Sequence, residues 1–221
     1  MAASVGVIVG VQAEARCLAG LGVLVGCSGA RPARLRAEAA RLLGAGVQGL
    51  VSFGLAGALV SELAPGELVV AEAVVLPDGR RLAADADWRR RLVAVLGAGG
   101  GTLAGSERLV ASAAAKAALH AATGACAVDM ESHVVAGAAA AAGLPFVLVR
   151  AIADPSGRAI PPSARHALGA DGEVRPAALL SGLLRRPQDL AALLRLGRDS
   201  ARAFATLRRV AALAGPDLAF R

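Results

Sequence analysis

Two carboxylates in the second half of the chain have the surroundings of a ligand site. Glu131 lies where a short apolar segment gives way to an Ala-rich stretch, and the dipole of a helix favours a negative charge at its start. Asp154 ends a segment that opens with the apolar run 146–149, which is typical of a strand covered on both faces. Because open α/β sheets bind ligands at the carboxyl ends of their strands, both groups are predicted to face one ligand.

Carboxylates in such positions can do two kinds of chemistry. An ionised carboxylate accepts hydrogen bonds from two hydroxyl groups, each worth about 1.5–3 kcal/mol, and a protonated one can give its proton to a leaving group. Each residue alone also has a structural interpretation, Glu131 as an acid of the first helical turn and Asp154 as a turn residue before Pro155. Their occurrence as a pair favours the functional interpretation.

Apolar runs alternate with helical stretches along the chain. Strands are expected at 4–11, 23–27, 49–53, 67–76 and 146–149, with a helix between 32 and 43. This alternation predicts an α/β fold. After Pro187 the pattern changes: leucines and Phe204 share one side of a helical wheel and arginines share another. We therefore expect a catalytic domain over 1–175 and a helical extension over 176–221 packed on it.

Composition narrows the class of protein. The chain has 221 residues, is 56% apolar and carries a formal charge of +7, so it has material for a buried core and suits an anionic partner. Lys116 is its single lysine. Aromatic residues make up 2% and tyrosine is absent, so few side chains can stack on bases and no nucleic-acid partner is expected.

Cysteines and histidines indicate neither a disulfide framework nor a metal site. Cys17, Cys27 and Cys126 lack paired ligand spacing and are expected to be reduced thiols, while the three histidines are assigned no catalytic role. No secretory leader is recognisable, and the longest apolar stretch is shorter than the roughly 20 residues of a membrane span. We expect a cytoplasmic protein with no metal and no cofactor.

The segments Val128–Glu131 and Arg150–Asp154 resemble the V-E-M-E-like and R-x-I-S-D-like segments of the nucleoside phosphorylase and nucleosidase superfamily. The resemblance implies a three-layer α/β/α fold with a mixed central sheet. It also implies that Glu131, with Asp129 and Met130 beside it, binds the ribose hydroxyls, and that Asp154 protonates the purine at N7. Protonation is needed because the N-glycosidic bond breaks through a sugar cation and the purine is a poor leaving anion.

Three further segments have counterparts in this family or in ligand sites generally. Glu14 matches, with a shift of one residue, an acid that activates the attacking water in nucleosidases; the alternative is a helix N-terminal acid. The turn of small residues before the helix at 32–43 is either an anion-binding site or an ordinary strand-to-helix turn. The turn after the strand 49–53 resembles a family turn whose backbone approaches ribose, base or phosphate. The residues in these two turns are Ser28, Gly29 and Arg34, and Gly54, Ala56 and Gly57.

The chain departs from the family at several positions. Hexameric phosphorylases hold phosphate with an arginine and a serine or threonine, where this chain has Ser52 and Leu55. Arg108 stands where an aromatic residue usually stacks on the purine, and Ala153 replaces a serine beside the acid. The residues implied to contact the base are Arg108, Leu109, Val128 and Ala153.

The segment 77–88 is shorter than the active-site flap of typical nucleosidases, and the tail from Leu183 onward reads L-L-R-R-P-x-x-L-x-x-L-L-R-L-x-R-D-S. Together they are similar to the hopanoid-associated branch of the superfamily. That resemblance implies release of adenine from adenosylhopane, a nucleoside whose 5′ carbon carries a lipid. A basic amphipathic tail can contact an acidic membrane surface, or dock its apolar face on the domain or on a second subunit.

Two alternatives stay open. One is a nucleosidase acting on methylthioadenosine or S-adenosylhomocysteine, and the other is an inactive nucleoside-binding or membrane scaffold protein. Water and phosphate are both candidates for the acceptor of the ribosyl group. By analogy with nucleosidases we expect a homodimer, cytoplasmic or peripheral at the inner membrane surface.

Overall fold

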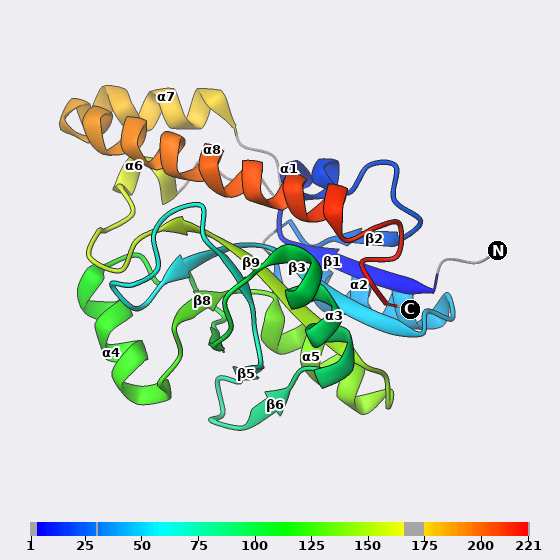
Figure 1. Ribbon diagram of the computed structural model, residues 1–221. Coiled ribbons are helices and arrows are strands. Elements are labelled where there is room, and N and C mark those ends of the chain that lie inside the picture. The colour runs from blue at the N-terminus through cyan, green and yellow to red at the C-terminus, as the bar shows by residue number, and fades with distance from the viewer. Residues whose placement is uncertain (1–3, 30, 166–174, 221) are drawn as a thin grey trace.

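The structure, a computed structural model, describes residues 4–29, 31–165 and 175–220 (Figure 1). Its strands are β1 (Val5–Val9), β2 (Leu24–Cys27), β3 (Gly49–Ala58), β4 (Leu68–Val70), β5 (Ala73–Val75), β6 (Arg81–Ala83), β7 (Thr102–Gly105), β8 (Ala127–Asp129) and β9 (Phe146–Asp154). Its helices are α1 (Gln12–Cys17), α2 (Pro32–Gly44), α3 (Ala86–Leu96), α4 (Ala113–Thr123), α5 (Ser132–Ala141), α6 (Pro162–Arg165), α7 (Pro176–Arg185), the 3-10 helix η1 (Pro187–Asp189) and α8 (Leu190–Leu213).

The described strands form one mixed sheet centred on β3 and β9, which run parallel. On one side β3 pairs with β1, and β1 with β2, all parallel. The remaining pairings close a ring: β9 pairs with β4, the chain continues into β5, β5 pairs with β7, β7 with β8, and β8 returns antiparallel to β3. The ring brings the carboxyl ends of β3, β8 and β9 to one place.

Helices cover both faces of this sheet. On one face α8 packs on β9 and contacts α1 and α3, around a core that includes Phe53, Trp88 and Leu207. On the other face α2 and α5 pack on the sheet around Leu42 and Leu148. The predicted three-layer α/β/α fold with a mixed sheet is confirmed.

Local sequence signals explain where several of these elements begin and end. Asp85 caps α3 by accepting from the backbone N–H of Trp88 at 2.8 Å, and Gly97 ends that helix in the left-handed conformation. Ser112 and Gly124 do the same for α4. The β-branched and apolar residues of β9 are buried on both faces, as expected for a central strand.

Two expectations on the strands are wrong in detail. The predicted turn 54–59 continues β3 to Ala58, because β9 runs beside it and supplies hydrogen-bond partners as far as Gly57, with one register irregularity before that residue. The predicted strand 67–76 is two strands, since Ala71 and Glu72 lie between the pairing of β4 with β9 and that of β5 with β7.

The C-terminal region divides into two parts. In the second half of α8, Ala203, Leu207 and Val210 are buried in the same core as β1, β3 and β9. In α7 and the first half of α8, apolar side chains remain exposed, including Leu184 at 76% and Leu194 at 55%. The buried face of α8 is therefore not the face that the leucine pattern predicts. The division at residue 175 stays a prediction, and it borders residues outside the described ranges.

Among the described helices, none combines the length and the apolar character that crossing a membrane requires.

Candidate active site

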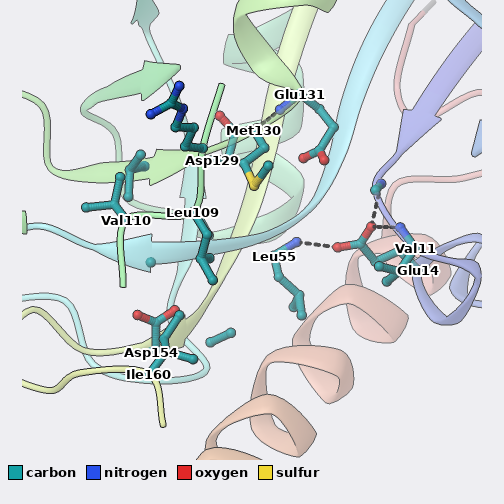
Figure 2. Close-up of a pocket in the computed structure, with 16 residues that line it drawn as sticks. Val11, Glu14, Leu55, Leu109, Val110, Asp129, Met130, Glu131, Asp154 and Ile160 are labelled. Atoms are coloured by element: carbon teal, nitrogen blue, oxygen red, sulfur yellow. Dashed lines mark hydrogen bonds between the residues drawn. The ribbon is translucent and has the colours of Figure 1, made fainter. Parts of the chain in front are cut away.

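A cavity of about 250 Å³ opens where β1, β3, β8 and β9 end (Figure 2). Residues that end or follow these strands form its wall, together with the loop after β7. The residues predicted from the sequence that line it are Glu14, Ala56, Gly57, Arg108, Leu109, Val128, Asp129, Met130, Glu131, Ala153 and Asp154. Chain segments more than a hundred residues apart thus contribute to one site.

Glu14 is held by backbone donors at the start of α1. Its Oε2 accepts from the N–H groups of Gly10 at 2.7 Å and Val11 at 2.9 Å, and its Oε1 accepts from Leu55 at 2.7 Å. Burial raises the pKa of Glu14, while the charge of Arg150 and the three backbone donors act in the opposite direction. A carboxylate can accept about four hydrogen bonds, so Glu14 keeps capacity to bind a ligand or a water.

Arg150, on β9, is a fully buried cation beneath the acids of the cavity. Its Nη2 donates to Oδ2 of Asp129, to Oγ of Ser52 and, at 3.2 Å, to Oγ of Ser132. The same atom lies 3.7 Å from Oε2 of Glu131. Arg150 therefore compensates two neighbouring carboxylates, which could not both be ionised there without a counter-charge.

Glu131 occupies the residue before α5, as predicted, and is only 8% exposed. Burial raises the pKa of its carboxyl to about 8; Arg150 lowers it, and Asp129 and Glu14 raise it further. Its Oε1 would lie 2.8 Å from a Cβ at Gly10, so the close approach of this carboxyl to the end of β1 requires glycine there. At neutral pH this group can both donate and accept a proton.

Asp154 ends β9 and faces the same cavity. Its Oδ2 accepts from Nζ of Lys116, a fully buried residue of α4. Burial raises the pKa of Asp154, and the charge of Lys116 opposes this rise. Figure 2 shows Glu131 and Asp154 on opposite sides of the pocket, with Met130 and Leu55 between them. The structure thus brings the two carboxylates to one cavity.

Four of the predicted site residues do not line this cavity. Ser28 lines a smaller one of about 10 Å³ on the far side of Met130 and Glu131, and Gly29 is buried beside it in the chain. Arg34 lies on the exposed face of α2, because Leu35 takes the buried position, so it does not complete an anion cradle at this cavity.

Gly54, the fourth, lies behind the cavity wall. A Cβ there would approach Oε1 of Glu14 at 2.5 Å and Nη1 of Arg150 at 2.8 Å. This glycine therefore makes room for two charged side chains and does not itself approach a ligand in the cavity. The segment 77–88, predicted to be a short flap, contributes no lining residue.

Sequence reasoning missed several residues of the site, including Gly10, Val11 and Leu55 in the cavity wall. Val110 and Ile160 line the cavity but are ordinary apolar residues, with no signal in their spacing. Arg150 carries a signal, as a charge within an apolar strand, and Lys116 carries one as the single lysine, within an Ala-rich helix. Neither signal indicates a role by itself, because only the fold shows the partners of these two residues.

The two histidines that the structure describes are not arranged as metal ligands. His120 lies in the last turn of α4, with Nδ1 2.8 Å from the carbonyl oxygen of Ala125, and burial lowers the pKa of His133. His166 lies outside the described residues. Within the described ranges no group of three or more His, Cys, Asp or Glu side chains could hold a metal ion.

Solved structures share this fold. The structure of futalosine hydrolase from Helicobacter pylori superposes with a TM-score of 0.67 at 20% identity, covering 84% of this chain and 98% of that one. The 5′-methylthioadenosine/S-adenosyl homocysteine nucleosidase of the same organism gives a TM-score of 0.65 at 19% identity, covering 83% and 96%. The S-adenosylhomocysteine nucleosidase of Streptococcus pyogenes gives 0.64 at 21%, covering 89% and 96%.

Among curated proteins, none matches this sequence. The family model described as the phosphorylase superfamily matches residues 10–185, a span that contains every residue lining the cavity. This match confirms the resemblance found from the Val128–Glu131 and Arg150–Asp154 segments at the level of the superfamily, and with it the prediction of an enzyme of the nucleoside phosphorylase and nucleosidase type. The chain belongs to the phosphorylase superfamily.

Proposed function

We propose that this enzyme cleaves the N-glycosidic bond of a purine nucleoside by a dissociative mechanism. One observation carries the proposal: Glu131 and Asp154 line opposite sides of a single cavity, with Glu14 on the Glu131 side. A nucleoside has hydroxyl groups at one end and a basic ring nitrogen at the other, so it matches the two carboxyl groups. The family membership and the nucleosidases among structures of the same fold support this class of reaction.

Asp154 acts as the general acid in this proposal. Its proton passes to N7 of the purine while the electrons of the C1′–N9 bond move to the ring, which leaves as a neutral base. Burial raises the pKa of Asp154, so a larger fraction of the group carries a proton near neutral pH. Leu109, Val110 and Ile160 offer an apolar surface to the base.

Glu131 binds the ribose hydroxyls, with Asp129 and Met130 beside it. Hydrogen bonds from hydroxyl groups to an ionised carboxylate strengthen as positive charge develops at C1′, because the carboxylate is close to the sugar. Arg150, 3.7 Å from Glu131, limits this effect but allows the buried group to ionise in a site of low polarity.

Water is the acceptor that the site supports better. Glu14 has capacity for one more hydrogen bond on the Glu131 side of the cavity, where it could orient a water towards C1′. The phosphate grip of hexameric phosphorylases lacks its counterparts here: Ser52 is buried against Arg150, and Arg34 is exposed on α2. We therefore propose hydrolysis. Adenine release that requires phosphate would instead identify phosphorolysis.

The proposed substrate is adenosylhopane, in hopanoid lipid biosynthesis. The sequence resemblance described above supports this choice, as do the exposed leucines and arginines of α7 and of the first half of α8. We name this region the tail surface; it consists of Leu180, Leu184, Leu190 and Leu194 with Arg185, Arg186 and Arg195. Exposed leucines among arginines fit an anionic lipid surface, which would bring the enzyme to a lipid-linked nucleoside.

Adenine release distinguishes the alternatives. The purified protein is incubated with adenosylhopane, methylthioadenosine, S-adenosylhomocysteine and adenosine, each with and without phosphate, and free adenine is quantified. Selective release from adenosylhopane, independent of phosphate, is the expected result. Preference for methylthioadenosine would identify an ordinary nucleosidase, and binding without release from any nucleoside would identify an inactive binding protein.

Vesicle flotation tests the tail surface. The protein is expected to float with vesicles of phosphatidylglycerol and to remain unbound at the bottom of the gradient when the vesicles are neutral. The double variant Leu180→Ser and Leu184→Ser should lose flotation, whereas Leu213→Ser, at the other end of α8 and 46% exposed, should not. Equal flotation of both variants would exclude this surface. The proposed homodimer is checked separately, by the molar mass of the protein in light scattering.

A further inference from the structure

The single lysine of the chain is fully buried directly behind the proposed general acid. Nζ of Lys116 donates to Oδ2 of Asp154, to the carbonyl oxygen of Pro155 at 2.7 Å and to that of Arg158 at 3.3 Å. An ammonium group has three donors, so these contacts use all of them. Lys116 thereby connects α4 to the end of β9 and to the loop after it.

Lys116 is not among the residues that line the cavity, whereas Asp154 is. On another side, the carboxyl of Asp154 packs against Gly57 of β3, where a Cβ would lie 3.1 Å from Oδ2 and 3.2 Å from Oδ1. The carboxyl group is thus held between a cation and a backbone position where an added Cβ would make a tight contact. These contacts fix its orientation before a ligand arrives.

We propose, on the basis of the function proposed above, that Lys116 is the positioning residue of the general acid. An ammonium group only donates hydrogen bonds, so Oδ2 of Asp154 must accept, and the proton of a neutral Asp154 resides on Oδ1. Oδ1 gives this proton to the base as the C1′–N9 bond breaks. Lys116 keeps its own three protons and stabilises the carboxylate that remains.

The electrostatic surroundings agree with this assignment. Asp154 lies in the fields of three other charged groups, Lys116, Arg158 and Asp199, but only Lys116 contacts its carboxyl directly. Arg158 is paired with Asp199 at 2.9 Å, so its charge is partly compensated. Removal of the Lys116 charge should therefore make Asp154 a weaker acid that keeps its proton to higher pH.

A spectroscopic experiment tests the pair without using activity. Because the chain contains one lysine, labelling with lysine enriched in ¹⁵N at Nζ and ¹³C at Cε gives a single side-chain signal. Its chemical shift is expected to show a step as Asp154 titrates, and this step should vanish in Asp154→Asn. A lysine signal that follows the same pH curve in the wild type and in Asp154→Asn would overturn the pairing. This test needs no Lys116 variant, so it remains decisive if the Lys116 variants fail to fold.

A kinetic experiment tests the role in catalysis. Lys116→Gln is compared with Lys116→Arg, which keeps the charge, on adenosine or the best purine nucleoside and on 4-nitrophenyl riboside, whose leaving group departs as a stable anion. Lys116→Gln is expected to lower kcat for the purine nucleoside about 100-fold with little change in KM, because a misplaced acid costs rates of that order. Cleavage of 4-nitrophenyl riboside should be retained, and Lys116→Arg should recover part of the loss.

The pH profile adds a third readout. For the purine nucleoside, the alkaline limb of kcat should move to higher pH in Lys116→Gln. Equal losses on both substrates with an unmoved limb would assign Lys116 a structural role only and overturn the inference, while leaving the proposed function intact. A wild-type protein that cleaves 4-nitrophenyl riboside but no purine nucleoside would instead overturn the proposed function and the inference together.

Discussion

Nη2 of Arg150 lies 3.7 Å from Oε2 of Glu131 and also binds Asp129, so one buried guanidinium serves two carboxylates from the β8–α5 junction. This relationship sets the chemistry of the sugar end of the cavity. Without Arg150, burial and the neighbouring acids would keep Glu131 neutral over a wide pH range. With it, the pKa of Glu131 is about 8, close enough to neutrality for ligand binding to change its ionisation.

Asp154→Asn should lower kcat for a purine nucleoside by about 100- to 10,000-fold, the range expected on loss of a general acid. KM should change little, because an asparagine retains the shape and one acceptor. Steady-state measurement of adenine release checks this. Asp78→Asn, in the exposed loop between β5 and β6, serves as the matched control and should behave as the wild type. A similar kcat in Asp154→Asn would remove the acid from the mechanism.

Glu131→Gln should damage both binding and turnover. A neutral amide loses charge-assisted bonds to the ribose hydroxyls, each worth about 1.5–3 kcal/mol, so kcat/KM should fall by roughly 10- to 140-fold for each bond lost. A 2′,3′-dideoxynucleoside should bind wild type and variant equally, because it offers no hydroxyl to this residue. If the variant prefers the nucleoside with ribose hydroxyls over the dideoxynucleoside as strongly as the wild type does, Glu131 does not contact the sugar.

Nucleoside binding should release protons below pH 8. The free protein holds a proton on Glu131 below its pKa of about 8, whereas ribose hydroxyls prefer the ionised form. Binding must then expel the proton, so the Kd should fall as pH rises towards about 8 and level off above it. Calorimetry of a non-cleaved nucleoside analogue in buffers of different ionisation heat measures the release. Uptake of protons instead would show that the neutral carboxyl binds the sugar.

Gly54→Ala should disturb the water side of the site. Its Cβ would come within 2.5 Å of Oε1 of Glu14 and 2.8 Å of Nη1 of Arg150, so one of these buried charges must move. Overpacking of this kind costs about 1–3 kcal/mol of unfolding free energy, and activity should fall with it.

Gly137→Ala is the matched control for that substitution. Gly137 lies within α5, where the space that a methyl group would take has no neighbouring atom within 4 Å, so alanine should stabilise the protein by about 0.5–1 kcal/mol. Chemical denaturation measures the unfolding free energy of the two variants, and adenine release measures their activity. An unchanged activity in Gly54→Ala would show that Glu14 or Arg150 can be displaced without loss.

The two halves of α8 should differ in their contribution to stability. Leu207 is fully buried in the core with β9, so Leu207→Ala should lower the free energy of unfolding by about 2–5 kcal/mol. Leu194 is 55% exposed, and Leu194→Ala should cost little in the isolated protein. Denaturant titration compares them. A large effect of Leu194→Ala would indicate that this leucine is covered in solution, and a concentration-dependent midpoint would identify a second copy of the chain as what covers it.

Much of this organisation could be predicted from local pattern. Asp154 at the end of an apolar strand and Glu131 before an Ala-rich helix are features of short segments, and the sheet places such positions at one edge. Caps such as Asp85 and Ser112 follow from the same local chemistry. The extent of β3 did not follow, because the continuation through Gly54 depends on β9, which lies far along the chain.

The sequence by itself determined the superfamily, the order of the elements and the two carboxylates, because these depend on residue type and spacing within segments of a few residues. Tertiary structure alone decided the partners of those carboxylates. Lys116 reaches Asp154 across 38 positions and Arg150 reaches Asp129 across 21, and no local pattern encodes such pairings. Only the folded sheet and the helices packed on it bury Lys116 and Arg150, which turns a lysine and an arginine into the cations that govern how the acids ionise.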